Sequence, residues 1–107
     1  MKHTSPHVYY INPMVIRWAD SVDRHGIDDA DAVHAMLNFY LHRPEFDEPR
    51  RPGSRRPDLF IGPPQQRGGP LIEVMAERVP PRDLVVFHVM PARPKHLALM
   101  EQRRVIP

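Results

Sequence analysis

The sequence predicts an α+β domain in which two N-terminal helices pack on one face of an antiparallel meander of three to four strands, with a short helix at the C-terminus. Apolar residues recur at helical spacing in two stretches before residue 44. Three apolar stretches separated by short turns follow residue 57. Consecutive strands joined by short turns form an antiparallel meander, so the helices can bury their apolar stripes only on one face of it.

The first helix is expected to begin at Asn12-Pro13, with Asn as its N-cap and Pro at the first helical position. It ends at His25-Gly26, where Gly takes the usual C-terminal place. Helical spacing predicts that Trp18 packs in the core rather than stacking on a nucleic-acid base. The apolar residues of this helix are Met14, Val15, Trp18 and Val22.

The second helix has the clearest periodicity in the chain, with apolar residues at i, i+3, i+4, i+7 and i+8. Asp28 is its expected N-cap, and Asp29 and Asp31 suit the positive end of the helix dipole. The helix must end before Pro44. Its apolar stripe is Val33, Met36, Leu37, Tyr40 and Leu41.

The second half of the chain alternates strands and turns. The third strand is apolar on both faces and is expected to be the most buried. Residues 8–11 add a candidate edge strand, and residues 43–57, with four prolines and five arginines, form a flexible loop. The expected elements are strands at 58–62, 71–79 and 84–90, turns at 63–70 and 80–83, and a helix at 95–103.

Length and composition bound the class of protein. The chain of 107 residues forms one domain, residues 1–107, and without cysteine it has no disulfide and no thiolate site. No apolar run reaches the ~18 residues of a membrane span, and the first residues lack the apolar core of a signal peptide. We therefore expect a cytoplasmic protein without a membrane partner.

The charge is distributed unevenly. Residues 1–49 hold 4 Lys/Arg against 8 Asp/Glu, whereas residues 50–107 hold 11 against 5. Most of the basic charge is arginine, which binds phosphate groups bidentately. The basic half indicates either a polyanionic partner such as RNA or DNA, or a solvated surface without a partner.

Four strings, in this order and spacing, resemble the BrnT-type toxins of bacterial type II toxin–antitoxin systems, which have a RelE-like fold. Arg24–Ile27 is similar to the basic-His-Gly-aliphatic string that opens the family's main helix, and Asp58–Gly62 to its strand ending in Gly. Gly69–Val74 resembles the following strand. Phe87–Arg93 resembles the last strand, which ends in Ala-Arg before a basic helix. The resemblance covers about residues 14–103.

The resemblance implies a RelE-like two-layer domain that acts as a toxin. Such a toxin would be an endoribonuclease that cleaves mRNA without a metal ion or other cofactor and thereby inhibits translation. Its expected partners are the RNA substrate and a small antitoxin of ribbon-helix-helix type, bound in a hetero-oligomer. The alternative function is a non-catalytic module of the same fold that binds nucleic acid or protein.

The candidate catalytic residues lie where the third strand ends. A metal-independent ribonuclease needs an acid, a base and cations for the charge that develops on the phosphate. His88, Arg93 and Lys95 supply these groups within eight residues, and simple alternation places His88 on the same face as Leu84, Val86 and Met90. Each residue also has a structural interpretation: a core histidine held by one hydrogen bond for His88, an ion pair with Glu73 or Glu77 for Arg93, and a solvated side chain for Lys95.

The remaining candidates follow from the resemblance and from charge. The resemblance places His25 in a recurring string, although the helix dipole alone also explains a cation there. We expect no metal site, because the spacing of His25, His34 and His42 fits no single helical face. Candidate RNA-binding residues are Arg50, Arg51, Arg55, Arg56 and Arg67.

Overall fold

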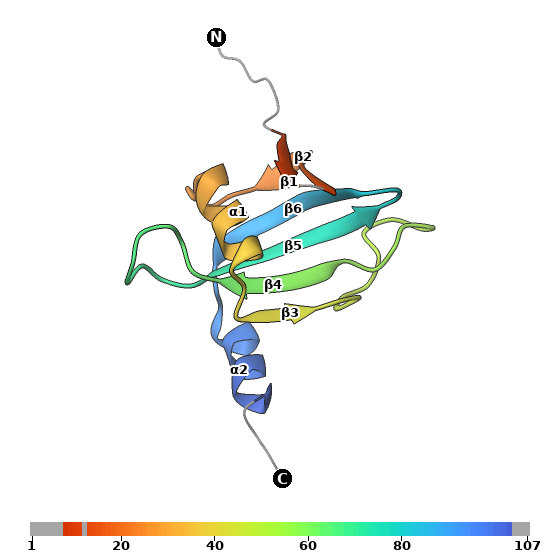
Figure 1. Cartoon of the computed structure of the whole chain (residues 1–107). Helices are drawn as coiled ribbons and strands as arrows, with labels where there is room; N and C mark the ends of the chain where they lie inside the picture. Colours follow the sequence, from red (N-terminus) through yellow and green to blue (C-terminus); the bar gives the residue numbers. More distant parts are fainter. Residues whose placement is uncertain (1–7, 12, 104–107) are drawn as a thin grey trace.

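The computed structural model describes residues 8–11 and 13–103. They form a six-stranded mixed sheet, curled into a half-barrel, with strand order β1-β2-β6-β5-β4-β3 (Figure 1). One helix follows the first two strands and another ends the described chain. The elements are β1 Tyr9–Ile11, β2 Met14–Asp23, α1 Asp29–Leu37, β3 Leu41–Arg43, β4 Asp58–Gly62, β5 Ile72–Val79, β6 Asp83–Pro91 and α2 Pro94–Arg103.

The prediction of two N-terminal helices is wrong, because the first of them is strand β2. Its buried residues are Ile16 and Trp18, which alternate with more exposed neighbours as a strand requires. The helical interpretation omitted Ile16, which is fully buried against the sheet. Trp18 is confirmed as a core residue. The proposed N-cap, Asn12, lies outside the described residues.

The second helix is confirmed but ends earlier than expected. α1 begins after Asp28, whose backbone oxygen accepts the first helical hydrogen bonds, and ends at Leu37, with Asn38 as its C-cap. The Tyr40 backbone N–H then donates to the Ile61 carbonyl, so the chain joins the sheet as β3. Leu41, expected on the helix, is instead buried in β3, because pairing with β4 replaces helical periodicity.

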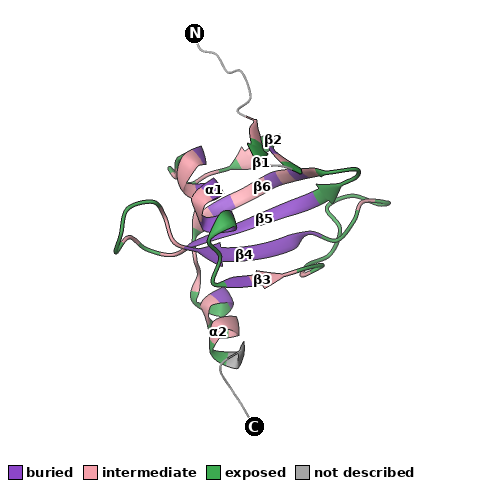
Figure 2. Cartoon of the chain, viewed as in Figure 1, coloured by how far each residue is buried: buried purple, intermediate pink, exposed green. Residues whose placement is uncertain are grey.

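The antiparallel meander of β4, β5 and β6 is confirmed, but it is half of a larger sheet. β3 adds to one side, and β2 pairs in parallel with β6 on the other, which makes the sheet mixed rather than antiparallel. The candidate edge strand is confirmed as β1, which pairs with β2. β4 and β5, not β6, are the most buried strands (Figure 2).

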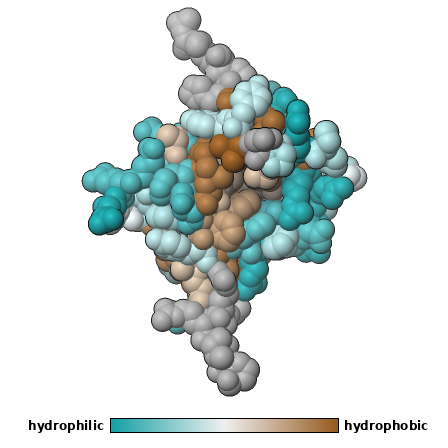
Figure 3. Space-filling view, viewed as in Figure 1, coloured by the Kyte–Doolittle hydropathy of each residue, from teal (hydrophilic) through white to brown (hydrophobic). Residues whose placement is uncertain are grey.

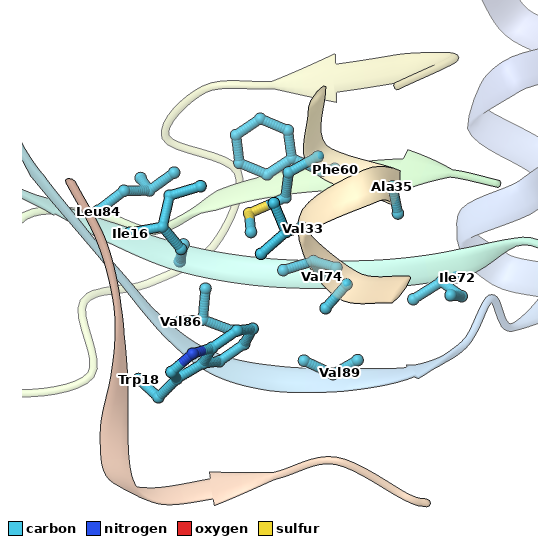
Figure 4. Close-up of a cluster of buried hydrophobic side chains, with 13 residues drawn as sticks. Ile16, Trp18, Val33, Ala35, Phe60, Ile72, Val74, Leu84, Val86 and Val89 are labelled. Carbon is cyan, nitrogen blue, oxygen red and sulfur yellow. The ribbon is translucent and has the colours of Figure 1, made fainter. Parts of the chain in front are cut away.

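Each face of the sheet has its own apolar cluster. On the α1 face, α1 packs on residues such as Ile16, Phe60 and Val74 (Figure 4). On the opposite face, called here the α2 face, Leu59 and Met75 belong to a second cluster that includes side chains of α2 and Phe46 of the 44–57 loop. The two-layer prediction, with helices on one face only, is therefore also wrong.

Gly62 allows α1 to lie close to β4. A Cβ atom at this position would overlap the backbone of Ala35, which belongs to the buried face of α1. We expect Gly62→Ala to lower the free energy of unfolding by about 1–3 kcal/mol, the usual cost of overpacking. Urea titration followed by circular dichroism measures the change.

Gly53→Ala is the matched control, because no described atom lies within 4 Å of a Cβ there and only its positive φ of 84° opposes the substitution. It is expected to cost about 1 kcal/mol. An effect at Gly62 no larger than that at Gly53 would contradict the close packing of α1 on β4.

Within the part of the chain that the structure describes, no helix has the length and apolar character needed to cross a membrane.

Candidate functional site

A carboxylate without solvent exposure lies at the centre of the α2 face. Glu73, on β5, is buried to 0% relative accessibility. Arg93 donates three hydrogen bonds to it, from its backbone N at 2.9 Å, from Nε at 2.9 Å and from Nη2 at 2.6 Å. His88 Nε2 and His96 Nδ1 each lie 2.8 Å from a Glu73 oxygen. We call these four residues the Glu73 cluster.

The cluster keeps Glu73 ionised. Burial by itself would raise the pKa of the Glu73 carboxyl, but the hydrogen bonds from Arg93, His88 and His96 together outweigh burial and lower that pKa from 4.5 to about 2. Glu73 is therefore an anion at neutral pH. An ionised carboxylate only accepts hydrogen bonds, so the bonded nitrogen of each histidine carries the proton.

A β-bulge in β6 brings His88 to this cluster. Ala76 of β5 faces Val86, yet the preceding residue, Met75, faces His88, so Phe87 is an additional residue in β6. The bulge puts His88 on the α2 face with Met90, while Leu84 and Val86 pack on the α1 face. The expectation that His88 shares a face with Leu84 and Val86 is therefore wrong.

His88 is partly exposed. Its side chain is 20% exposed, and because Nε2–H donates to Glu73, Nδ1 is the ring nitrogen left to accept a proton. The ring of His25 lies edge-on to it, with centroids 6.4 Å apart, and His25 Nε2 is 3.2 Å from Asp23 Oδ2. The structure thus brings together His88, His25 and Arg93, whose side chain is 35% exposed.

A second buried carboxylate, Glu77, lies on the same face, four residues along β5 from Glu73. Glu77 pairs with Val85, beyond the bulge from the pair of Glu73 and Met90. Its Oε1 lies 3.6 Å from Arg51 and 4.0 Å from Arg50, and its buried Oε2 has no hydrogen-bond partner among the described residues. The Arg50 guanidinium also lies 4.3 Å from the ring centroid of Phe87, the bulge residue. The 44–57 loop therefore brings Arg50 against Phe87, the residue that precedes His88.

The other predicted residues lie elsewhere. Lys95 is an exposed residue of α2, and Arg67 is exposed in the 63–70 turn. Arg56 bonds within its own loop, to the Asp47 carbonyl at 3.0 Å. Arg55 lies at a cavity on the α1 face. Only Arg50 and Arg51 of the five candidate RNA-binding arginines thus contact the α2 face in the described chain.

Two members of the Glu73 cluster were not among the predicted site residues. Glu73 was foreseen only as a partner of Arg93, and that pairing is confirmed. A carboxylate at an apolar position of an expected strand was the available signal, since a buried charge must be paired. His96 gave no signal, because its approach to Glu73 depends on how α2 packs. Its ring also lies edge-on to Phe46.

The cluster has the groups of a metal-independent acid–base site. A histidine oriented by a buried carboxylate can take up a proton at its free nitrogen, and an adjacent guanidinium can stabilise an anion. Among the described residues, no group of three or more His, Asp or Glu side chains is placed to hold a metal ion.

Comparison of the chain with protein-family models, with curated proteins and with solved structures gives no match.

Proposed function

We propose that this chain is a metal-independent endoribonuclease and acts as the toxin of a type II toxin–antitoxin pair. The observation that carries the proposal is the Glu73 cluster, in which a buried anion orients the partly exposed side chains of His88 and Arg93. The resemblance of four strings to BrnT-type toxins supports the biological role. The proposal does not include two N-terminal helices, because the first of them is strand β2.

The proposed reaction uses the 2′-hydroxyl of RNA as the nucleophile. His88 Nδ1 takes the proton of this hydroxyl, whose oxygen attacks the adjacent phosphorus. Arg93 stabilises the charge that develops on the phosphoryl oxygens, and His25 donates a proton to the departing 5′-oxygen. The P–O5′ bond breaks, and the products carry a 2′,3′-cyclic phosphate and a 5′-hydroxyl.

The positive charge around the cluster suits an RNA substrate. Arg50 and Arg51 lie beside Glu77 on the same face, and guanidinium groups bind the phosphate backbone without regard to sequence. We further propose a cytoplasmic location and a small antitoxin of ribbon-helix-helix type as the partner.

The test is cleavage of a short single-stranded RNA by the purified protein in EDTA. We expect products with 2′,3′-cyclic phosphate ends and no cleavage when a single 2′-deoxynucleotide replaces the nucleotide at the cleavage position. In bacteria, expression of the chain should arrest growth, and co-expression of a neighbouring antitoxin gene should relieve the arrest. RNA that stays intact, with no growth arrest by a well-expressed chain, would reject the proposal.

A non-catalytic RNA-binding module is the second candidate function. The observation in its favour is that Arg93, His88 and His96 all direct polar atoms to Glu73, as in a network that only stabilises the fold. Retardation of intact RNA on a gel, weakened by Arg50→Gln and Arg51→Gln, would favour binding without cleavage.

A further inference from the structure

A cavity of about 550 Å³ opens on the α1 face of the sheet. It lies between the C-terminal end of α1 and the turn that joins β5 to β6. Apolar side chains gather in the middle of this face (Figure 3). The cavity is lined by Met36, Phe60 and Leu84 of the core. Four of its other lining residues are exposed large apolar side chains: Met14 at 37%, Leu37 at 45%, Phe39 at 46% and Val79 at 41%.

The cavity is separate from the Glu73 cluster. Strand register pairs Phe60 with Val74, which belongs to the α1 cluster, whereas Glu73 and Met75 point to the α2 face. An occupant of the cavity would therefore leave His88 accessible. The cavity would bind its occupant whether or not the chain cleaves RNA.

Charged groups line one side of the cavity, and its carboxylates already have partners. Asp58 is buried and accepts hydrogen bonds from Arg78 Nε at 3.0 Å, with His42 Nε2 2.8 Å away. Asp83 lies 3.3 Å from Arg17. Neither carboxylate therefore needs a cation from a ligand.

Two lining arginines, by contrast, have no acidic partner among the described residues. Arg55 and Arg82 are exposed and form no ion pair or side-chain hydrogen bond within the described residues. Guanidinium groups bind carboxylates in a bidentate geometry. The cavity therefore combines an apolar interior with unpaired positive charge.

We propose that this cavity binds a small amphipathic carboxylate, with an apolar body on the order of ten carbon atoms. Its volume falls within the ~300–1,000 Å³ of ligand pockets, which are mostly apolar with a few polar groups that fix orientation. The apolar body covers Met36, Phe60 and Phe39. The carboxylate lies against Arg55 and Arg82. These two arginines select a negatively charged ligand and fix its orientation in the cavity.

Three probes that share one apolar body test the proposal: decanoate, decanol and decylammonium, each below its aggregation concentration. Isothermal titration calorimetry with the full chain should show one site for decanoate, about tenfold tighter than for decanol, because a charge-assisted pair adds to the apolar contact. Decylammonium should bind more weakly than decanol. Amide chemical shifts should move at Phe39 and Val79 and not at His88.

The double variant Arg55→Gln, Arg82→Gln identifies the cationic groups. Both residues are exposed, so the fold should be unchanged. Decanoate should lose about tenfold in affinity, while decanol binding stays the same. Arg67→Gln is the matched control, because Arg67 is an exposed arginine in a turn that does not line the cavity.

Equal affinity for the three probes, or decanoate binding that survives the double variant, would overturn the assignment of a carboxylate ligand. Sedimentation of the chain at increasing concentration gives a further check. A dimer that protects Leu37 and Phe39 from solvent, with no decanoate binding, would show that this face joins two copies of the chain and would also overturn the proposal.

Discussion

Glu73→Gln is expected to lower the free energy of unfolding at pH 7 by about 3–5 kcal/mol, the usual cost of breaking a buried ion pair. The amide removes the charge that faces Arg93, His88 and His96. Its NH₂ group is a hydrogen-bond donor and would face the N–H groups of these residues, which are also donors. Arg93 would remain charged and partly buried without its carboxylate. Urea titration at pH 7 measures the loss.

The pH dependence of the same two proteins separates the charge from the shape of the side chain. Because folding lowers the pKa of Glu73 from 4.5 to about 2, its stabilisation is complete above pH 4.5 and is lost as the pH falls through about 2. The shift corresponds to about 3 kcal/mol. The wild-type protein should lose this much more stability between pH 5 and 2 than Glu73→Gln.

The exposed Asp47 gives the control, since Asp47→Asn removes a carboxylate that lies on the surface of the 44–57 loop. It should change stability at pH 7 by less than about 0.5 kcal/mol. If Glu73→Gln and the wild-type protein showed parallel stability profiles from pH 5 to 2, the buried anion would not be the source of the acid sensitivity.

His88→Gln is expected to lower RNA cleavage by about 10²–10⁴-fold while the protein stays folded. The glutamine amide can still donate a hydrogen bond to Glu73, so the buried carboxylate keeps its neighbour. The amide cannot take up the proton of the 2′-hydroxyl, so the chemical step is slowed. Single-turnover cleavage measures the loss.

His34→Gln is the matched control, because His34 lies on α1, where its Nδ1 is 2.8 Å from the Pro63 carbonyl and far from the α2 face. Its cleavage rate should equal that of the wild-type protein. A His88→Gln protein that cleaves RNA at the wild-type rate would remove His88 from the mechanism, whatever the state of the fold.

Arg93→Ala is a less informative substitution than His88→Gln. It would remove the guanidinium that stabilises the charge on the phosphoryl oxygens in the proposed reaction. The Arg93 side chain donates two hydrogen bonds to Glu73, so the alanine variant also leaves a buried carboxylate underpaired. Loss of activity in Arg93→Ala would therefore mix a chemical effect with unfolding.

The second half of the fold could be predicted from the sequence because turns rich in Pro and Gly mark its boundaries. β4 was predicted with its observed bounds, and β5, β6 and α2 within one residue at each end. The first half misled because Met14, Val15, Trp18 and Val22 fit a helical period, whereas the buried pair Ile16 and Trp18 fits a strand. Only the sheet, which pairs β2 with β6, decides between the two.

The candidate site could be predicted in part. The sequence predicted a histidine and an arginine at the end of β6, and it offered Glu73 as an ion-pair partner of Arg93. The position of His88 was not, because a bulge depends on the register between β5 and β6 rather than on residue type. The contact between His96 and Glu73 depends on how α2 packs on the sheet, and no local sequence pattern determines that packing.

Because of the bulge at Phe87, the site depends on the number of residues in β6 between Leu84 and His88. Leu84 and Val86 face α1, and the extra residue Phe87 lets His88 face the α2 side. One residue more or fewer between Leu84 and His88 would turn His88 to the α1 face and remove it from the cluster without changing any side chain in it. The length of this strand is thus as much a part of the site as Glu73 itself. An alignment of related chains should therefore place the extra residue, Phe87 here, at the same position in each chain. In a chain that lacks this residue, a histidine at the position of His88 would face α1 and not Glu73.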